Sequence, residues 1–73
     1  MDKIYATIAG NIKRWRKIRG MSQEKLAEAA DLSRNYISLV ETGQERIGMH
    51  AFIRIKRALG VSACDLFGDC RKQ

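Results

Sequence analysis

Apolar residues recur three and four positions apart along most of this 73-residue chain, the spacing that places them on one face of an α-helix. No stretch keeps the strict alternation of apolar and polar residues that marks a half-buried strand. The chain also contains no proline, the residue that interrupts helices most strongly. The pattern therefore predicts an all-α fold.

The first predicted helix covers about residues 3–19. Asp2 is its expected N-cap, and Gly20 is expected to end it in the left-handed conformation. Ile18 lies outside the apolar stripe and is expected at a subunit contact or half exposed. The stripe itself, which should face the core, consists of Ile4, Ile8, Ile12 and Trp15.

Four later stretches share one pattern, in which an apolar residue, a small capping residue and an apolar residue at the fourth helical position form a hydrophobic staple. They are Met21-Ser22-Leu26, Leu32-Ser33-Ile37, Ile47-Gly48-Phe52 and Val61-Ser62-Leu66. Ser62 should also form a capping box with Asp65. With the first helix, these starts predict one compact five-helix domain over residues 1–73. The later helices are expected at about 23–30, 34–42, 49–59 and 63–67, followed by a disordered tail at about 69–73.

The second and third predicted helices are separated only by Asp31, Leu32 and Ser33. Such a short connection is typical of a helix-turn-helix, which would cover about residues 22–42. Asp31 lies where this turn often needs a positive φ, and aspartate tolerates that conformation better than most residues. Because the second helix of this motif enters the DNA major groove, the pattern predicts contact between DNA and the third helix.

The third helix, within the stretch SRNYISLVETG, should turn Ile37 and Val40 inward. Arg34 and Asn35 open the helix, where an arginine suits guanine O6 and N7 and an asparagine suits adenine N6 and N7. An arginine opposes the macrodipole at this end, so an external base or anion would explain it, although a solvated surface arginine is the alternative. The predicted base-facing residues are Ser33, Arg34, Asn35, Ser38 and Leu39.

Leu39 has two interpretations: contact with a thymine methyl group, or partial burial beside Val40. Glu41 carries a negative charge in the last turn of its helix, which the dipole disfavours, so it needs a tertiary partner, and Arg16 is the candidate. The predicted phosphate contacts flank the third helix and include the free amide end of the second; they are Ser22, Gln23, Tyr36, Thr42, Gln44 and Arg46.

Lysine and arginine total 14 residues against 8 aspartates and glutamates, and the net charge of +6 predicts attraction to a polyanion. The run KRWRKIR would contribute to this positive field or form a solvated helix face. No apolar stretch approaches the roughly 20 residues of a membrane span, and no secretion signal is present, so a soluble cytoplasmic protein is expected. Cys64, Cys70 and the single His50 do not form a metal-binding pattern, so neither metal nor cofactor is expected.

The stretches IAGNIKRWRKIRGMSQEKLAEAADLS, NYISLVETG and ALGVSACDLF resemble, between Ile8 and Phe67, the lambda-repressor-like helix-turn-helix family of phage Cro proteins and xenobiotic-response-element regulators. By this resemblance Gln23 is the phosphate-contacting glutamine. Arg16 and Glu41 would form the family's internal ion pair. Ser33, Arg34, Asn35 and Ser38 with Leu39 would form the base-facing surface.

The size of the chain and the segment RNYIS are also similar to the controller proteins of restriction-modification systems. This resemblance implies a sequence-specific transcriptional regulator that binds a two-fold symmetric operator on double-stranded DNA as a homodimer. It implies a dimer surface on the fourth and fifth helices, near Ala51, Ile55, Ala63 and Phe67.

Other functions have less support in the sequence. A phage or mobile-element repressor would have the same signature, and an antitoxin-type protein-interaction module is a further alternative. An enzyme is not expected, because the chain has one histidine, no glycine-rich phosphate loop and no cluster of metal ligands. Membrane-surface binding would need a long basic amphipathic helix, whereas these apolar faces are required for a core.

Overall fold

A computed structural model describes residues 3–68, which form helices and connecting turns without a β-strand. The all-α, five-helix prediction is confirmed for these residues, and the observed helix ends differ from the predicted ones by no more than one residue. Asp2 and the expected tail at 69–73 lie outside the described residues. The helices are α1 (Lys3–Ile18), α2 (Gln23–Ala30), α3 (Arg34–Glu41), α4 (Met49–Leu59) and α5 (Ala63–Phe67).

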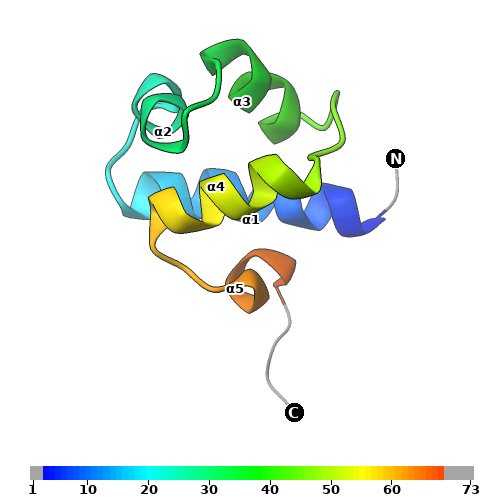
Figure 1. Ribbon diagram of the computed structural model, residues 1–73. Helices are drawn as coiled ribbons and strands as arrows, with labels where there is room; N and C mark the ends of the chain where they lie inside the picture. The colour runs from blue at the N-terminus through cyan, green and yellow to red at the C-terminus, as the bar shows by residue number, and fades with distance from the viewer. Residues whose placement is uncertain (1–2, 69–73) are drawn as a thin grey trace.

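The helices surround one hydrophobic core (Figure 1). In the view of Figure 1, α2 and α3 lie above α4 and α1, whereas α5 lies below them. The packing pairs α2 with both α3 and α4, and it pairs α1 with α5. The most deeply buried side chains come from all five helices and are Ile12, Leu26, Ile37, Ile55, Leu59 and Leu66. These contacts hold α3 through Ile37 and Val40, while Arg34 and Asn35 at its start stay exposed.

The apolar stripe of α1 differs from the prediction at its first turn. Ile8 and Ile12 are buried as expected, and Trp15 packs partly buried against the core. Ile4, in contrast, is 46% exposed, because Tyr5 occupies the inward position in this turn and packs against the core instead. Ile18 is 54% exposed, which agrees with its position outside the stripe.

Local hydrogen bonds define the starts of α2, α3 and α5. The hydroxyl oxygens of Ser22 and Ser33 each accept a bond from the backbone amide three residues later, at 3.0 Å. The predicted capping box of Ser62 and Asp65 is present with both of its bonds. Asp31 adopts the predicted left-handed conformation, with φ 58° and ψ 47°. Each of these caps satisfies amide or carbonyl groups that a helix end leaves free.

The short helix α5 is fixed against α1 by a single side-chain bond. Asn11 Nδ2 donates to the backbone oxygen of Leu66 at 2.9 Å. Gly68 ends α5 with φ +84°, and a Cβ atom there would lie 2.8 Å from Asn11 Nδ2. The positive φ favours a glycine here, and a larger residue would also displace the Asn11 side chain from its bond to Leu66. Within residues 3–68, no helix is long and apolar enough to cross a membrane.

Candidate nucleic-acid interface

Helix α3 divides into a buried and an exposed face. Ile37 and Val40 are 0% and 2% exposed, so they hold the helix on the core as expected. Of the predicted base-facing residues, Ser33, Arg34 and Asn35 are exposed together at the start of the helix, whereas Ser38 and Leu39 are half-buried. The first turn of α3 therefore presents a guanidinium and an amide group side by side to solvent.

The side chain of Leu39 is half-buried, which lies between burial beside Val40 and full exposure to a DNA base. Its side chain is partly covered, and part of it stays accessible on α3. Its backbone oxygen accepts bonds from the amides of Gln44 and Glu45, at 2.9 and 3.2 Å. These bonds terminate α3 and start the loop to α4. The remaining exposed part of Leu39 has the apolar character that a thymine methyl group would require.

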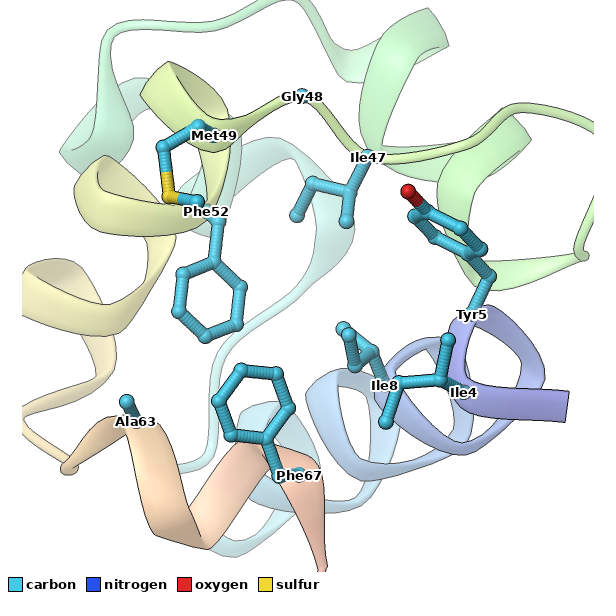
Figure 2. A pocket seen from close by; sticks show the side chains of 9 residues that line it. All are labelled: Ile4, Tyr5, Ile8, Ile47, Gly48, Met49, Phe52, Ala63 and Phe67. Atoms are coloured by element: carbon cyan, nitrogen blue, oxygen red, sulfur yellow. The ribbon is translucent and has the colours of Figure 1, made fainter. Parts of the chain in front are cut away.

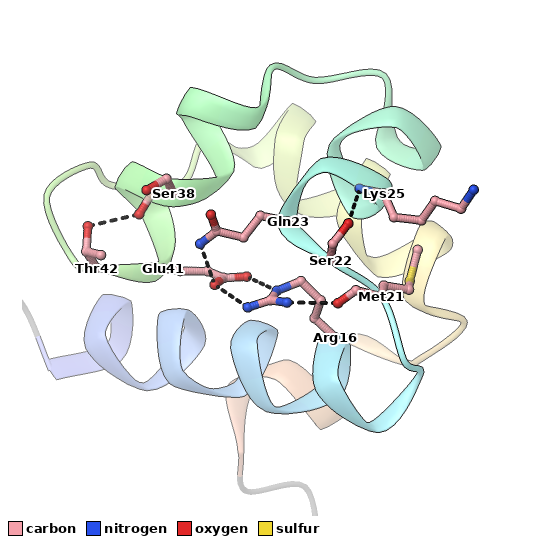
Figure 3. Close-up of polar contacts among 8 residues, drawn as sticks. All are labelled: Arg16, Met21, Ser22, Gln23, Lys25, Ser38, Glu41 and Thr42. Carbon is pink, nitrogen blue, oxygen red and sulfur yellow. Dashed lines mark hydrogen bonds and ion pairs between the residues drawn. The ribbon is translucent and has the colours of Figure 1, made fainter.

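An ion pair beneath α3 joins it to α1, as Figure 3 shows. Arg16 Nε donates to Glu41 Oε2 at 2.7 Å, and Arg16 Nη2 donates to Glu41 Oε1 at 3.1 Å. Arg16 Nη1 also donates to the backbone oxygen of Met21 at 2.8 Å. The bidentate geometry offsets the unfavourable position of the carboxylate at the C-terminal end of α3. The two residues that the sequence paired are thus brought together, and they fix the angle between α1 and α3.

Gln23 extends this network to α2. Its Nε2 donates to Glu41 Oε1 at 3.1 Å, so one carboxylate is shared by side chains from α1 and α2 (Figure 3). The sequence assigned Gln23 only a phosphate contact, and the bond to Glu41 was missed because 18 residues separate the two. An amide nitrogen has two hydrogens, so the second remains available to an external acceptor. Ser22, beside it, is exposed at the start of α2.

The end of α3 is closed by Thr42 and Gln44. Thr42 Oγ1 donates to the backbone oxygen of Ser38 at 2.9 Å and accepts a bond from Gln44 Nε2 at 3.0 Å. Both predicted phosphate-contacting side chains are therefore also bonded to the protein. Both residues are exposed, so their remaining hydrogen-bonding capacity faces solvent.

Tyr36 connects α3 to the start of α4. Its hydroxyl oxygen accepts a bond from the backbone amide of Gly48 at 3.1 Å, a contact that the sequence did not predict. Because the oxygen serves as the acceptor, the hydroxyl hydrogen stays free to donate to an anion. Arg46 lies in the same connection, exposed, with its guanidinium carbon 5.3 Å from the centre of the Tyr5 ring.

The cations of the run at 13–19 do not all contribute to a surface field. Arg16 is buried in the ion pair, and Arg19 Nε donates to the backbone oxygen of Leu59 at 2.8 Å. Arg14 and Arg19 both lie over the Trp15 ring, 5.9 and 5.1 Å from its centre. Two cations of the run therefore have structural bonds: the pairing of Arg16 was expected, whereas the bond of Arg19 to Leu59 was not.

The expected dimer surface needs correction at two positions. Ile55 is 0% exposed and Ala51 is 7% exposed, because both face the core of the same chain. Neither offers a partner an appreciable surface. Ala63 is half-buried and Phe67 is 42% exposed, so only these two of the four expected residues remain accessible.

Those two residues line an apolar groove of about 580 Å³ between the start of α1, the start of α4 and α5 (Figure 2). Met49 and Ile4 are 74% and 46% exposed at this groove. The rings of Phe52 and Phe67 stack within it, with their centres 5.4 Å apart. We call this surface, lined by Ile4, Tyr5, Ile8, Ile47, Gly48, Met49, Phe52, Ala63 and Phe67, the apolar groove.

No cluster of three potential metal ligands occurs among residues 3–68. Cys64 is a free, exposed thiol, and His50 is exposed near the start of α4. Cys70 lies outside the described residues.

Comparison with known proteins places these features in a family. The helix-turn-helix family model matches residues 12–66. The control protein C.MunI of Mycoplasma sp is 31% identical over 74 aligned positions, covering all of both chains. The control protein C.BamHI of Bacillus amyloliquefaciens is 41% identical over 58 residues, 73% of this chain and 72% of its own. The restriction-modification controller C.Esp1396I, solved as a tetramer in complex with its natural 35-base-pair operator, is 30% identical with TM-score 0.84, over 92% of this chain and 88% of its own.

Proposed function

Because this chain belongs to the helix-turn-helix family and is a DNA-binding regulator homologous to restriction-modification controller proteins, we propose that it acts as a homodimer on a two-fold symmetric operator. In this proposal α3 enters the major groove, and binding tunes transcription of the regulator's own gene and of an endonuclease gene. The controller relatives favour this role over that of a phage repressor or an antitoxin. Its DNA target would place the protein in the cytoplasm.

The observation that carries this proposal is the division of α3. Arg34 and Asn35 are exposed at its first turn, while Ile37 and Val40 are buried at 0% and 2% exposure. A recognition helix needs this arrangement, because it must be held firmly from behind and present hydrogen-bonding groups in front. Arginine and asparagine are the side chains that form bidentate bonds to guanine and adenine, respectively.

Groups on both sides of α3 would hold the sugar-phosphate backbone. Ser22 and the second amide hydrogen of Gln23 lie at the start of α2, where free backbone amides also favour an anion. The hydroxyl hydrogen of Tyr36 and the guanidinium of Arg46 lie on the other side. Such contacts would set the orientation of the protein without reading the sequence.

Binding titrations of Arg34→Ala and Asn35→Ala test the base contacts. The duplex is one recovered by selection from a random DNA pool. Each variant should lose about 1–3 kcal/mol of binding free energy and relax the preference at one base position. Arg57→Ala is the matched control, because it removes an equal charge from an exposed position on α4. Equal losses on the selected and on a random duplex would restrict Arg34 and Asn35 to phosphate contacts.

We assign the apolar groove to the second copy of the chain. Met49, Ile4 and Phe67 are 74%, 46% and 42% exposed there, and large apolar side chains gathered on one surface are typical of an interface. A chain of 73 residues has a small core, so burial of this surface would add stability to each subunit. The selected DNA sites should then contain two inverted half-sites, whose spacing reports the geometry of the dimer.

A further inference from the structure

We propose that Tyr5 is a positioning residue for DNA binding, because its ring holds Arg46 in place for a phosphate of the operator. This inference rests on the proposed function. It concerns a residue in the first turn of α1, well before the loop that carries Arg46 in the sequence. The contact that motivates it is the 5.3 Å separation between the Arg46 guanidinium carbon and the centre of the Tyr5 ring.

The loop that carries Arg46 is fixed at both ends. On one side, the amides of Gln44 and Glu45 donate to the backbone oxygen of Leu39. On the other side, the amide of Gly48 donates to the hydroxyl oxygen of Tyr36, and Ile47 is 9% exposed in the core. The backbone at position 46 is therefore held next to the recognition helix. Only the long side chain of Arg46 is left to be oriented.

Among the described residues, no carboxylate neutralises the charge of Arg46, which is open to an external anion. Neither of the two ion pairs among residues 3–68 includes Arg46. By contrast, Arg16, Arg19 and Arg54 use their N–H groups on backbone or carboxylate oxygens of the protein. A guanidinium placed over an aromatic ring keeps its N–H donors unused, so a phosphate can accept bonds from them.

Tyr5 is suited to this task because it is itself held. It is half-buried and packs against the core, and it also lines the apolar groove beside Ile8 and Ile47 (Figure 2). Its ring thus lies between the apolar groove and the loop after α3. An arginine stem has many rotamers, and a fixed aromatic face reduces the entropy lost when the guanidinium meets a phosphate.

The experiment is a double-mutant cycle with Tyr5→Leu, Arg46→Ala and the combined variant, and Tyr5→Phe is the matched control. Affinity is measured on the selected duplex and on a random duplex, across a series of salt concentrations. Tyr5→Leu should weaken binding about two- to fivefold, whereas Tyr5→Phe, which keeps the ring, should bind as the natural protein does. Arg46→Ala should reduce the salt slope by about 1, and adding Tyr5→Leu to it should change the affinity no further.

A second measurement follows the contact in the protein without DNA. Protons of the Arg46 side chain should show a ring-current shift in the natural protein and in Tyr5→Phe, and they should lose it in Tyr5→Leu. Thermal unfolding and sedimentation of each variant check that folding and self-association are retained. If Tyr5→Leu weakens the fold, the contact is still tested by Tyr5→Phe, in which the Arg46 protons must keep the ring-current shift.

Two results would overturn the inference. One is that Tyr5→Leu lowers the DNA affinity equally in the natural protein and in Arg46→Ala. Tyr5 would then act through the fold or through self-association. The other is no effect of Tyr5→Leu on either duplex. Failure of the proposed function is a separate outcome, in which the natural protein would bind selected and random duplexes equally. The double-mutant cycle on the random duplex would still decide whether Tyr5 positions Arg46.

Discussion

Arg16 and Glu41 join α1 to α3 through an ion pair at 2.7 Å, with side chains only 10% and 1% exposed. Gln23 of α2 donates to the same carboxylate. Three helices of the proposed DNA-binding unit therefore meet at one buried group, and the orientation of α3 depends on it. Removing the charge of one partner would leave the other buried and uncompensated.

Glu41→Ala should accordingly lower the free energy of unfolding by about 3–5 kcal/mol, a large part of the stability of a small domain. Urea denaturation followed by circular dichroism measures this loss. Glu45→Ala is the matched control, because Glu45 is exposed and is expected to change stability little. The paired replacement Arg16→Met with Glu41→Leu should recover most of the lost stability. A loss below 1 kcal/mol in Glu41→Ala would show that the ion pair is not needed to hold α3.

Asp31→Gly should raise the free energy of unfolding by up to about 1 kcal/mol, because glycine adopts a positive φ without the steric cost of a Cβ atom. Asp31 has φ 58°, the only positive φ of a non-glycine residue among 3–68. The bond from Arg54 Nη1 to the backbone oxygen of Asp31, at 3.2 Å, does not need the aspartate side chain. The ion pair between Arg54 Nη1 and Asp31 Oδ2, at 3.6 Å, is lost, but both side chains are exposed to solvent and such a pair contributes little to stability. Thermal unfolding measures the change. Asp31→Ala, which keeps a Cβ atom, should give no such gain, and a stabilised alanine variant would contradict the explanation.

The accessible part of Leu39 gives a prediction about DNA rather than stability. If it contacts a thymine methyl group, replacing that thymine with deoxyuridine should weaken binding by about 1 kcal/mol, the lower range of a specific base contact. The same replacement should have no effect on Leu39→Ala. A scan of thymine positions in the selected duplex, titrated with both proteins, provides the measurement. Identical losses for both proteins at every position would assign Leu39 to packing beside Val40.

Met49→Glu should dissociate the proposed dimer, because a carboxylate would be buried in an apolar interface at the proposed two-fold contact. The dissociation constant should rise at least about tenfold, and binding to a two-half-site operator should weaken while binding to one half-site persists. Ile18→Glu is the matched control, since Ile18 is also exposed, at 54%, but does not line the apolar groove. Sedimentation equilibrium measures the change. If Ile18→Glu dissociated the dimer and Met49→Glu did not, the interface would lie at the other end of α1.

The helices, the caps of α2, α3 and α5 and the buried face of α3 could all be predicted from the sequence alone. These features depend on residues that are close in the sequence: the hydroxyl of Ser33, for example, caps the amide of Tyr36 three residues later. The pairing of Arg16 with Glu41 could not be predicted from neighbouring residues, because 25 residues separate the two. That prediction rested on the family resemblance and on the need to neutralise a carboxylate at the C-terminal end of a helix.

Two features could not be predicted without the packing of the helices: which apolar surface stays exposed, and which polar side chains bond to one another. Ala51 and Ile55 would follow the same apolar periodicity in the core and at a subunit interface, so the pattern could not distinguish these two locations. In the structure, α4 turns both residues toward the core. The bond from Gln23 to Glu41 and the position of the Arg46 guanidinium over the Tyr5 ring join residues from different helices and loops. Periodicity reports the face of one helix, whereas these contacts depend on how the helices pack against one another.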